Sequence, residues 1–102
     1  MFGEESQLYY AFAHFQAARY AEAAAAARYA LQRRPRHPVA YIMAAAARGL
    51  GGERDNAREL AAQAMILVPD ISTADVEENF PYSGLEDRSR LAMGLRETGL
   101  PD

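Results

Sequence analysis

The sequence YAEAAAAARYALQRRP at residues 20–35 is the clearest indication of how this chain folds. It contains no glycine, and its only proline is Pro35 at its end, so no helix breaker interrupts it. Alanine is the strongest helix former, and residues 23–27 are all alanine. Small residues recur at the spacing of one helix face, namely Ala23, Ala27, Ala30 and Leu31. We therefore predict a helix with a face of methyl groups that another helix can approach closely.

A second stretch, ARELAAQAMILVP at residues 57–69, repeats this design. Its small-face alanines and its closing proline all follow their counterparts in the first stretch at one fixed offset along the chain. The matched pairs are Ala23 and Ala57, Ala27 and Ala61, Ala30 and Ala64, and Pro35 and Pro69. Matches at one fixed offset indicate an internal repeat, which is typical of helical-repeat proteins.

The composition indicates one small folded domain. The 102 residues are 50% hydrophobic and 25% charged, which is ordinary for a globular protein. Cysteine and lysine are absent from the sequence, which excludes disulfides, thiolate ligands and lysine Schiff bases. A net charge of −3 argues against nucleic acid as the main partner. No apolar run approaches the ~18 residues of a membrane span and no signal peptide is evident, so we expect a cytoplasmic protein without a membrane partner.

Helix breakers and capping residues divide the chain into six predicted helices. The first four span residues 6–17, 20–34, 39–50 and 53–68. A short fifth helix follows a cap at Ser72 or Thr73 and ends at Phe80-Pro81, and the sixth spans residues 85–98. Gly99 is suited to a left-handed conformation after this last helix. The inner face of the sixth helix is expected to carry Leu91, Ala92 and Leu95.

Paired helices that recur at this offset resemble the tetratricopeptide repeat, whose period is about 34 residues. The small-residue and proline positions of the family pattern are kept in both copies, but most large positions are substituted, and Ala27 and Ala61 replace the usual aromatic residue. Gly52 keeps the turn glycine of the second copy, whereas Ala18 replaces it in the first. The resemblance covers roughly residues 4–70.

This resemblance implies an all-α fold, a tetratricopeptide-like right-handed superhelix of two degenerate helical hairpins and two closing helices. The single domain would comprise a first repeat at residues 4–37, a second at 38–71 and capping helices at 72–102. The tail resembles the end of repeat arrays attached to bacterial class III adenylate/guanylate cyclases and winged-helix regulators. The residues that carry this second resemblance are Phe80-Pro81-Tyr82, Gly94-Leu95-Arg96 and Gly99-Leu100-Pro101.

The sequence contains no catalytic constellation. His14 falls on a packed helix stripe and His37 in a proline-rich loop, and neither belongs to a metal-binding or nucleophile-activating pattern. We therefore expect neither enzyme activity nor a metal or cofactor. The only basic cluster comprises Arg33, Arg34 and Arg36. It is suited to phosphate or an acidic partner, but we favour a solvated helix end that offsets the helix dipole.

The second face of the first and third helices is the candidate binding surface. In the tetratricopeptide family these helices line a concave groove, and the resemblance places an apolar set of residues there. This set comprises Leu8, Tyr9, Phe12, Gln16, Val39, Ile42 and Met43. Monomers rarely expose such a patch, so we expect the closing helices or a partner chain to cover it.

The function implied by this surface is protein–protein interaction without catalysis. The chain would bind a peptide or helix of another protein, or associate with itself as a homodimer. The alternative is a C-terminal regulatory or oligomerisation segment of a bacterial nucleotide cyclase or transcriptional regulator. If the patch is a binding surface, Phe12→Ala weakens association and leaves helicity nearly intact, whereas loss of the fold identifies Phe12 as a core residue.

Overall fold

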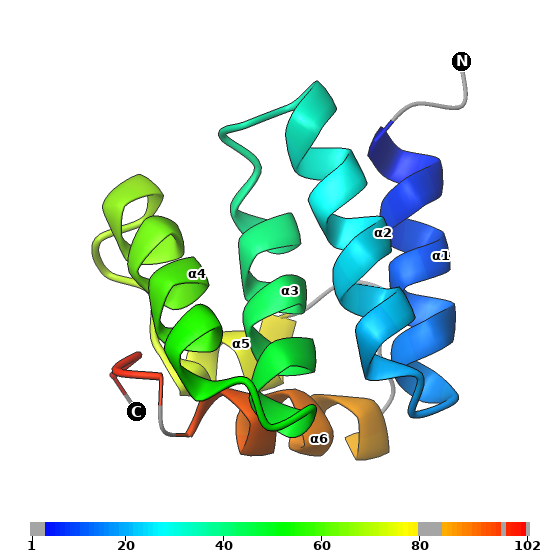
Figure 1. Ribbon diagram of the computed structural model, residues 1–102. Helices are drawn as coiled ribbons and strands as arrows, with labels where there is room; N and C mark the ends of the chain where they lie inside the picture. Colours follow the sequence, from blue (N-terminus) through cyan, green and yellow to red (C-terminus); the bar gives the residue numbers. More distant parts are fainter. Residues whose placement is uncertain (1–3, 80–84, 97, 102) are drawn as a thin grey trace.

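The computed structural model describes the backbone of residues 4–79, 85–96 and 98–101. Within these ranges the chain forms six α-helices and no strand, which confirms the predicted all-α class. The helices are α1 (Glu4–Gln16), α2 (Tyr20–Arg33), α3 (Pro38–Leu50), α4 (Arg54–Leu67), α5 (Thr73–Asn79) and α6 (Leu85–Leu95). Figure 1 shows α1 to α4 standing side by side in chain order, with α6 lying across one end of this row.

The first two hairpins, α1–α2 and α3–α4, repeat at the offset that the sequence indicates. The helix bounds 4, 16, 20 and 33 of the first hairpin become 38, 50, 54 and 67 in the second, so the offset is the same at all four bounds. The residues that follow the second helix of each hairpin also match, with φ −135° and ψ 86° at Arg34 and φ −133° and ψ 85° at Val68. The two hairpins therefore share one backbone design.

The start of α5 matches its predicted cap. Ser72 Oγ accepts a hydrogen bond from the Asp75 N–H at 3.1 Å, and Asp75 Oδ2 accepts one from the Ser72 N–H at 3.1 Å. Two otherwise unpaired donors are thus satisfied reciprocally, as in a capping box. The predicted break at Phe80-Pro81 lies outside the described residues.

The last helix is shorter than predicted, because α6 ends at Leu95 and not at residue 98. The carbonyl of Leu95 accepts hydrogen bonds from the Thr98 N–H at 3.1 Å and from Thr98 Oγ1 at 2.7 Å. These bonds close a turn in place of the next helical hydrogen bond. Gly99 adopts the predicted left-handed conformation, with φ 94°.

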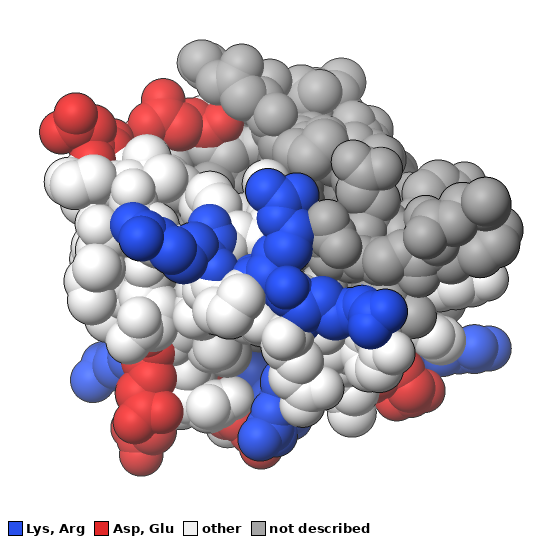
Figure 2. All heavy atoms as spheres, turned by 90° about the horizontal axis from the view of Figure 1, so that it is seen from above, with Lys and Arg blue, Asp and Glu red and all other residues white. Residues whose placement is uncertain are grey.

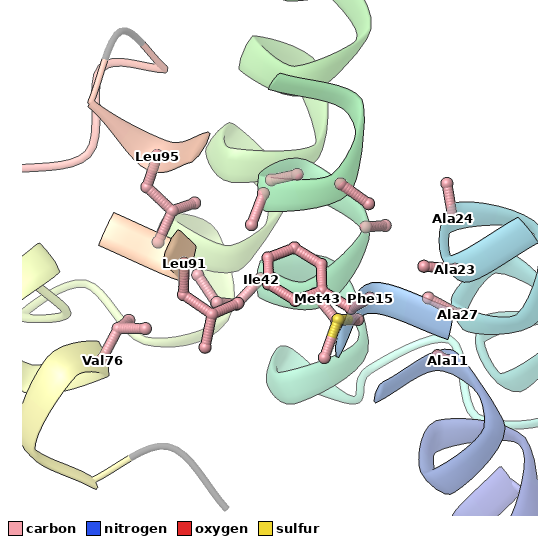
Figure 3. Packing of buried hydrophobic residues seen from close by; sticks show 14 of the residues in the cluster. Ala11, Phe15, Ala23, Ala24, Ala27, Ile42, Met43, Val76, Leu91 and Leu95 are labelled. Atoms are coloured by element: carbon pink, nitrogen blue, oxygen red, sulfur yellow. The ribbon is translucent and has the colours of Figure 1, made fainter. Parts of the chain in front are cut away.

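Helix α3 forms the centre of the core. It packs against α2, α4 and α6, and residues 42–47 are all buried. The small faces predicted for α2 and α4 are buried too, with Ala23, Ala27 and Ala30 on α2 and Ala57, Ala61 and Ala64 on α4. Figure 3 shows alanines of α2 and large side chains of α3 and α6 converging on one cluster. Methyl-lined faces let these helices lie close together, as the sequence predicted.

Candidate protein-binding surface

The residues predicted to bind a partner lie in different environments. Phe12, Ile42 and Met43 belong to one hydrophobic cluster and expose only 3%, 1% and 1% of their surface. Val39 is partly buried against this cluster, and Gln16 is exposed. Leu8 and Tyr9 lie on α1, but their side chains are outside the described part of the chain. Phe12, Ile42 and Met43 therefore lie together in the structure, but they are buried and not on the surface.

Helix α6 covers this apolar face. Leu91 and Leu95 are fully buried in the same cluster as Ile42 and Met43, and Figure 3 shows the Leu91 side chain directed toward Ile42. The fully buried residues Leu91 and Leu95, together with Ala92, form the inner face of α6, as the sequence predicted. The sequence left the closing helices as one possible cover of this face, and α6 packs against the α3 part of it.

The crossing of α6 over α3 depends on two glycines. A Cβ atom at Gly49 would overlap the carbonyl oxygen of Gly94, and a Cβ atom at Gly94 would overlap the carbonyl oxygen of Ala46. The backbones of the two helices are thus in direct contact, which only glycine permits at these positions. This contact fixes where α6 lies along α3.

Arg90 attaches α6 to the other helix of the face, α1. Its Nη1 donates to the carbonyl of Phe15 at 2.8 Å and its Nη2 to the carbonyl of Gln16 at 3.3 Å. The guanidinium carbon also lies 5.7 Å from the centre of the Phe15 ring. A cation at the last carbonyls of a helix is favourable because the helix dipole is negative there. Sequence reasoning missed Arg90, because nothing local to it indicates a partner so remote along the chain.

The chain after α6 is also held in place. The Thr73 N–H at the start of α5 donates to the Pro101 carbonyl at 2.6 Å, and Leu100 exposes only 5% of its surface. These contacts fasten the tail to the start of α5. Phe12, 3% exposed, belongs to the hydrophobic core, and we now expect Phe12→Ala to destabilise the fold, contrary to the expectation of nearly intact helicity.

The basic cluster lies at the carboxyl end of α2, which is the end away from α6. Arg33, Arg34 and Arg36 are exposed, and the Arg33 guanidinium stands 5.9 Å from the centre of the Tyr29 ring. Figure 2, the view from the top of Figure 1, shows arginine side chains gathered over this end of the molecule. The repeat-equivalent end of α4 has the same backbone but no basic residue in its last turn. The arginines are therefore not needed to end the helix.

The described residues contain no group of three or more histidine, cysteine, aspartate or glutamate side chains placed to hold a metal ion. None of the helices that they form is long and apolar enough to cross a membrane. Comparison of the chain with protein-family models, with curated proteins and with solved structures finds no match.

Proposed function

We propose that this chain is a non-catalytic, tetratricopeptide-like interaction module whose α1–α3 face binds a helix of another protein molecule. The observation that carries the proposal is that this face already accepts a helix, the chain's own α6. The anchors Leu91 and Leu95 lie one helical turn apart on α6 and are fully buried, which is the spacing of helix-in-groove recognition. The repeated hairpin supports the superhelical arrangement that this function uses in the tetratricopeptide family.

A partner helix would compete with α6 for the same face. Because α6 belongs to the same chain, its effective concentration at the face is high, and a partner must offer a better fit or arrive when α6 is displaced. A competing helix needs a small residue where α6 has Gly94, because α3 approaches that position with its backbone. It also needs two large apolar residues in place of Leu91 and Leu95.

The test uses α6 as its own model partner. In the full chain, Leu91→Gln and Leu95→Gln together weaken the α6 anchors and alter no residue of α1 to α4. A fluorescent peptide with the sequence of residues 85–101 is then titrated in and followed by anisotropy. We expect the double variant to bind the peptide and its thermal midpoint to rise with peptide concentration.

Two controls make this result specific. Met93 is exposed on α6, so a chain with Met93→Gln keeps its face covered and should bind the peptide no better than the parent chain. A peptide that carries the two glutamine substitutions should not bind. Failure of the double variant to bind the parent peptide at millimolar concentration, or to gain helicity with it, rejects the proposed binding face.

A further inference from the structure

The contact between the two hairpins provides a template for a second interface. Helices α2, α3 and α4 meet around a hollow of about 260 Å³. The lining comes from α2 (Ala24, Arg28 and Leu31), from α3 (Ala44 and Arg48) and from α4 (Asn56 and Leu60). Because the hairpins repeat at a fixed offset, each lining residue has a counterpart on an outer face of the molecule.

These counterparts lie on α1 and α2 at one end of the helix row and on α4 at the other. Figure 1 shows α1 and α4 as its outermost members. The residues of α2 correspond to Arg58, Ala62 and Met65 on α4. The residues of α3 correspond to Tyr10 and His14 on α1, and those of α4 correspond to Glu22 and Ala26 on α2. Placing one copy of the chain after another, as the second hairpin follows the first, brings the two sets together.

The substitutions at these positions suit contact between two copies. Tyr10 replaces Ala44, and its ring has the size to fill the hollow that the alanine leaves. Tyr10 is 58% exposed in the single chain, whereas the equivalent Ala44 is buried in the contact between the hairpins. On the facing helix, Ala62 replaces Arg28 and so removes a charge from the contact.

The charges across this contact are also complementary. Ala24 and Asn56 line the same hollow within one chain, and their counterparts are Arg58 and Glu22. An uncharged pair inside the chain thus becomes a pair of opposite charges between copies. The α4 end offers further apolar surface, because Ile66, next to Met65, is 69% exposed. Opposite charges at matched positions fix the register of an interface.

We propose that copies of this chain stack head to tail, with the α1 end of one copy on the α4 end of the next. The two surfaces differ, so the interface is heterologous and leaves one free surface of each kind at the ends of the stack. The proposal does not depend on the helix-binding face, since α6 remains in place in every copy. Mass is therefore expected to grow continuously with concentration and not to stop at a dimer.

The test is the molar mass by light scattering up to millimolar concentration, first for the parent chain and then for two end-blocked variants. Tyr10→Glu blocks the α1 end, and Ala62→Glu blocks the α4 end. Each variant alone should be a monomer, with association at least tenfold weaker than in the parent. Their mixture should form a dimer of twice the 11.2 kDa chain mass, because the unblocked end of each variant remains available.

A symmetric interface cannot turn two monomeric variants into a dimer on mixing. Both copies contribute the same surface to such an interface, so the blocked surface of either variant would be part of the contact. Gln32, exposed on α2 and outside both sets, provides the control, and Gln32→Glu should leave the association of the parent unchanged. If a glutamate variant loses helicity, the charge pair supplies a second test. Glu22→Arg or Arg58→Glu alone should weaken association, and the two together in one chain should restore it. A monomeric parent chain, or a variant mixture that stays monomeric, overturns the proposal.

Discussion

The two hairpins have the same backbone but different surroundings. Helix α3 lies between α2, α4 and α6, and its residues 42–47 are buried without a gap. Helix α1 occupies the equivalent place in the first hairpin, yet Tyr10 and Ala13 on it are exposed. The regular small residues therefore set the hairpin geometry, whereas the residues that break the repeat determine how the rest of the chain attaches.

Positions 15 and 49 show most directly how residues that break the repeat attach the rest of the chain. They are equivalent in the repeat, and both contact α6. Phe15 is a fully buried ring whose centre lies 5.6 Å from that of Tyr20, and Arg90 stands over it. Gly49 has no side chain and lets the backbone of α6 touch α3. Helix α6 is therefore held by a bulky side chain on the first hairpin and by close backbone approach on the second.

Phe15→Ala is expected to cause the largest loss of stability. Removing a fully buried phenylalanine costs about 3–5 kcal/mol, because transfer energy is lost and a cavity remains. The free energy of unfolding from urea denaturation measures this effect. Phe15→Leu should cost much less, because it keeps most of the apolar contact. A loss below about 1 kcal/mol for Phe15→Ala would contradict the place of this ring in the core.

Gly49→Ala tests the contact between α6 and the second hairpin. We expect it to lower the free energy of unfolding by about 1–3 kcal/mol, which is less than the loss expected for Phe15→Ala. The added Cβ collides with the Gly94 backbone, which cannot move away as a flexible side chain would. Amide hydrogen exchange should speed up at Leu91 and Leu95 on α6, while protection of the α2 amides persists. Equal protection of α6 in variant and parent would show that the glycine contact does not hold it.

The sequence contains most of the information on the hairpins and little on how the tail attaches. Alanine faces and prolines at a fixed offset are local signals, so the predicted bounds of the first four helices lie close to the observed ones. The inner face of α6 was also recognisable from its spacing. Its end was predicted too late, because the Thr98 hydroxyl takes up the Leu95 carbonyl in a way that spacing does not reveal.

The candidate site was harder to predict, because an apolar helix face has the same pattern whether it meets a partner or another part of its own chain. Phe12, Ile42 and Met43 lie in one buried cluster, and Leu91 and Leu95 of α6 belong to the same cluster. The contacts that decide this are remote in sequence, such as Arg90 with the carbonyl of Phe15. The local spacing of apolar residues cannot predict a contact between residues so far apart in the sequence.

The turns between the paired helices offer the smallest and cleanest comparison. Ala18 and Gly52 are equivalent, and both adopt positive φ, 60° and 85°. Nothing lies within 4 Å of a Cβ built at Gly52, so a substitution there acts through the backbone alone. We expect Gly52→Ala to destabilise and Ala18→Gly to stabilise the chain, each by about 0.5–1 kcal/mol, the left-handed strain minus the change in unfolded-state entropy. The free-energy changes of distant substitutions usually add, so the double variant should have the parent's free energy of unfolding in urea denaturation. A difference of more than about 0.5 kcal/mol from the parent would mean that the two turns are not energetically equivalent.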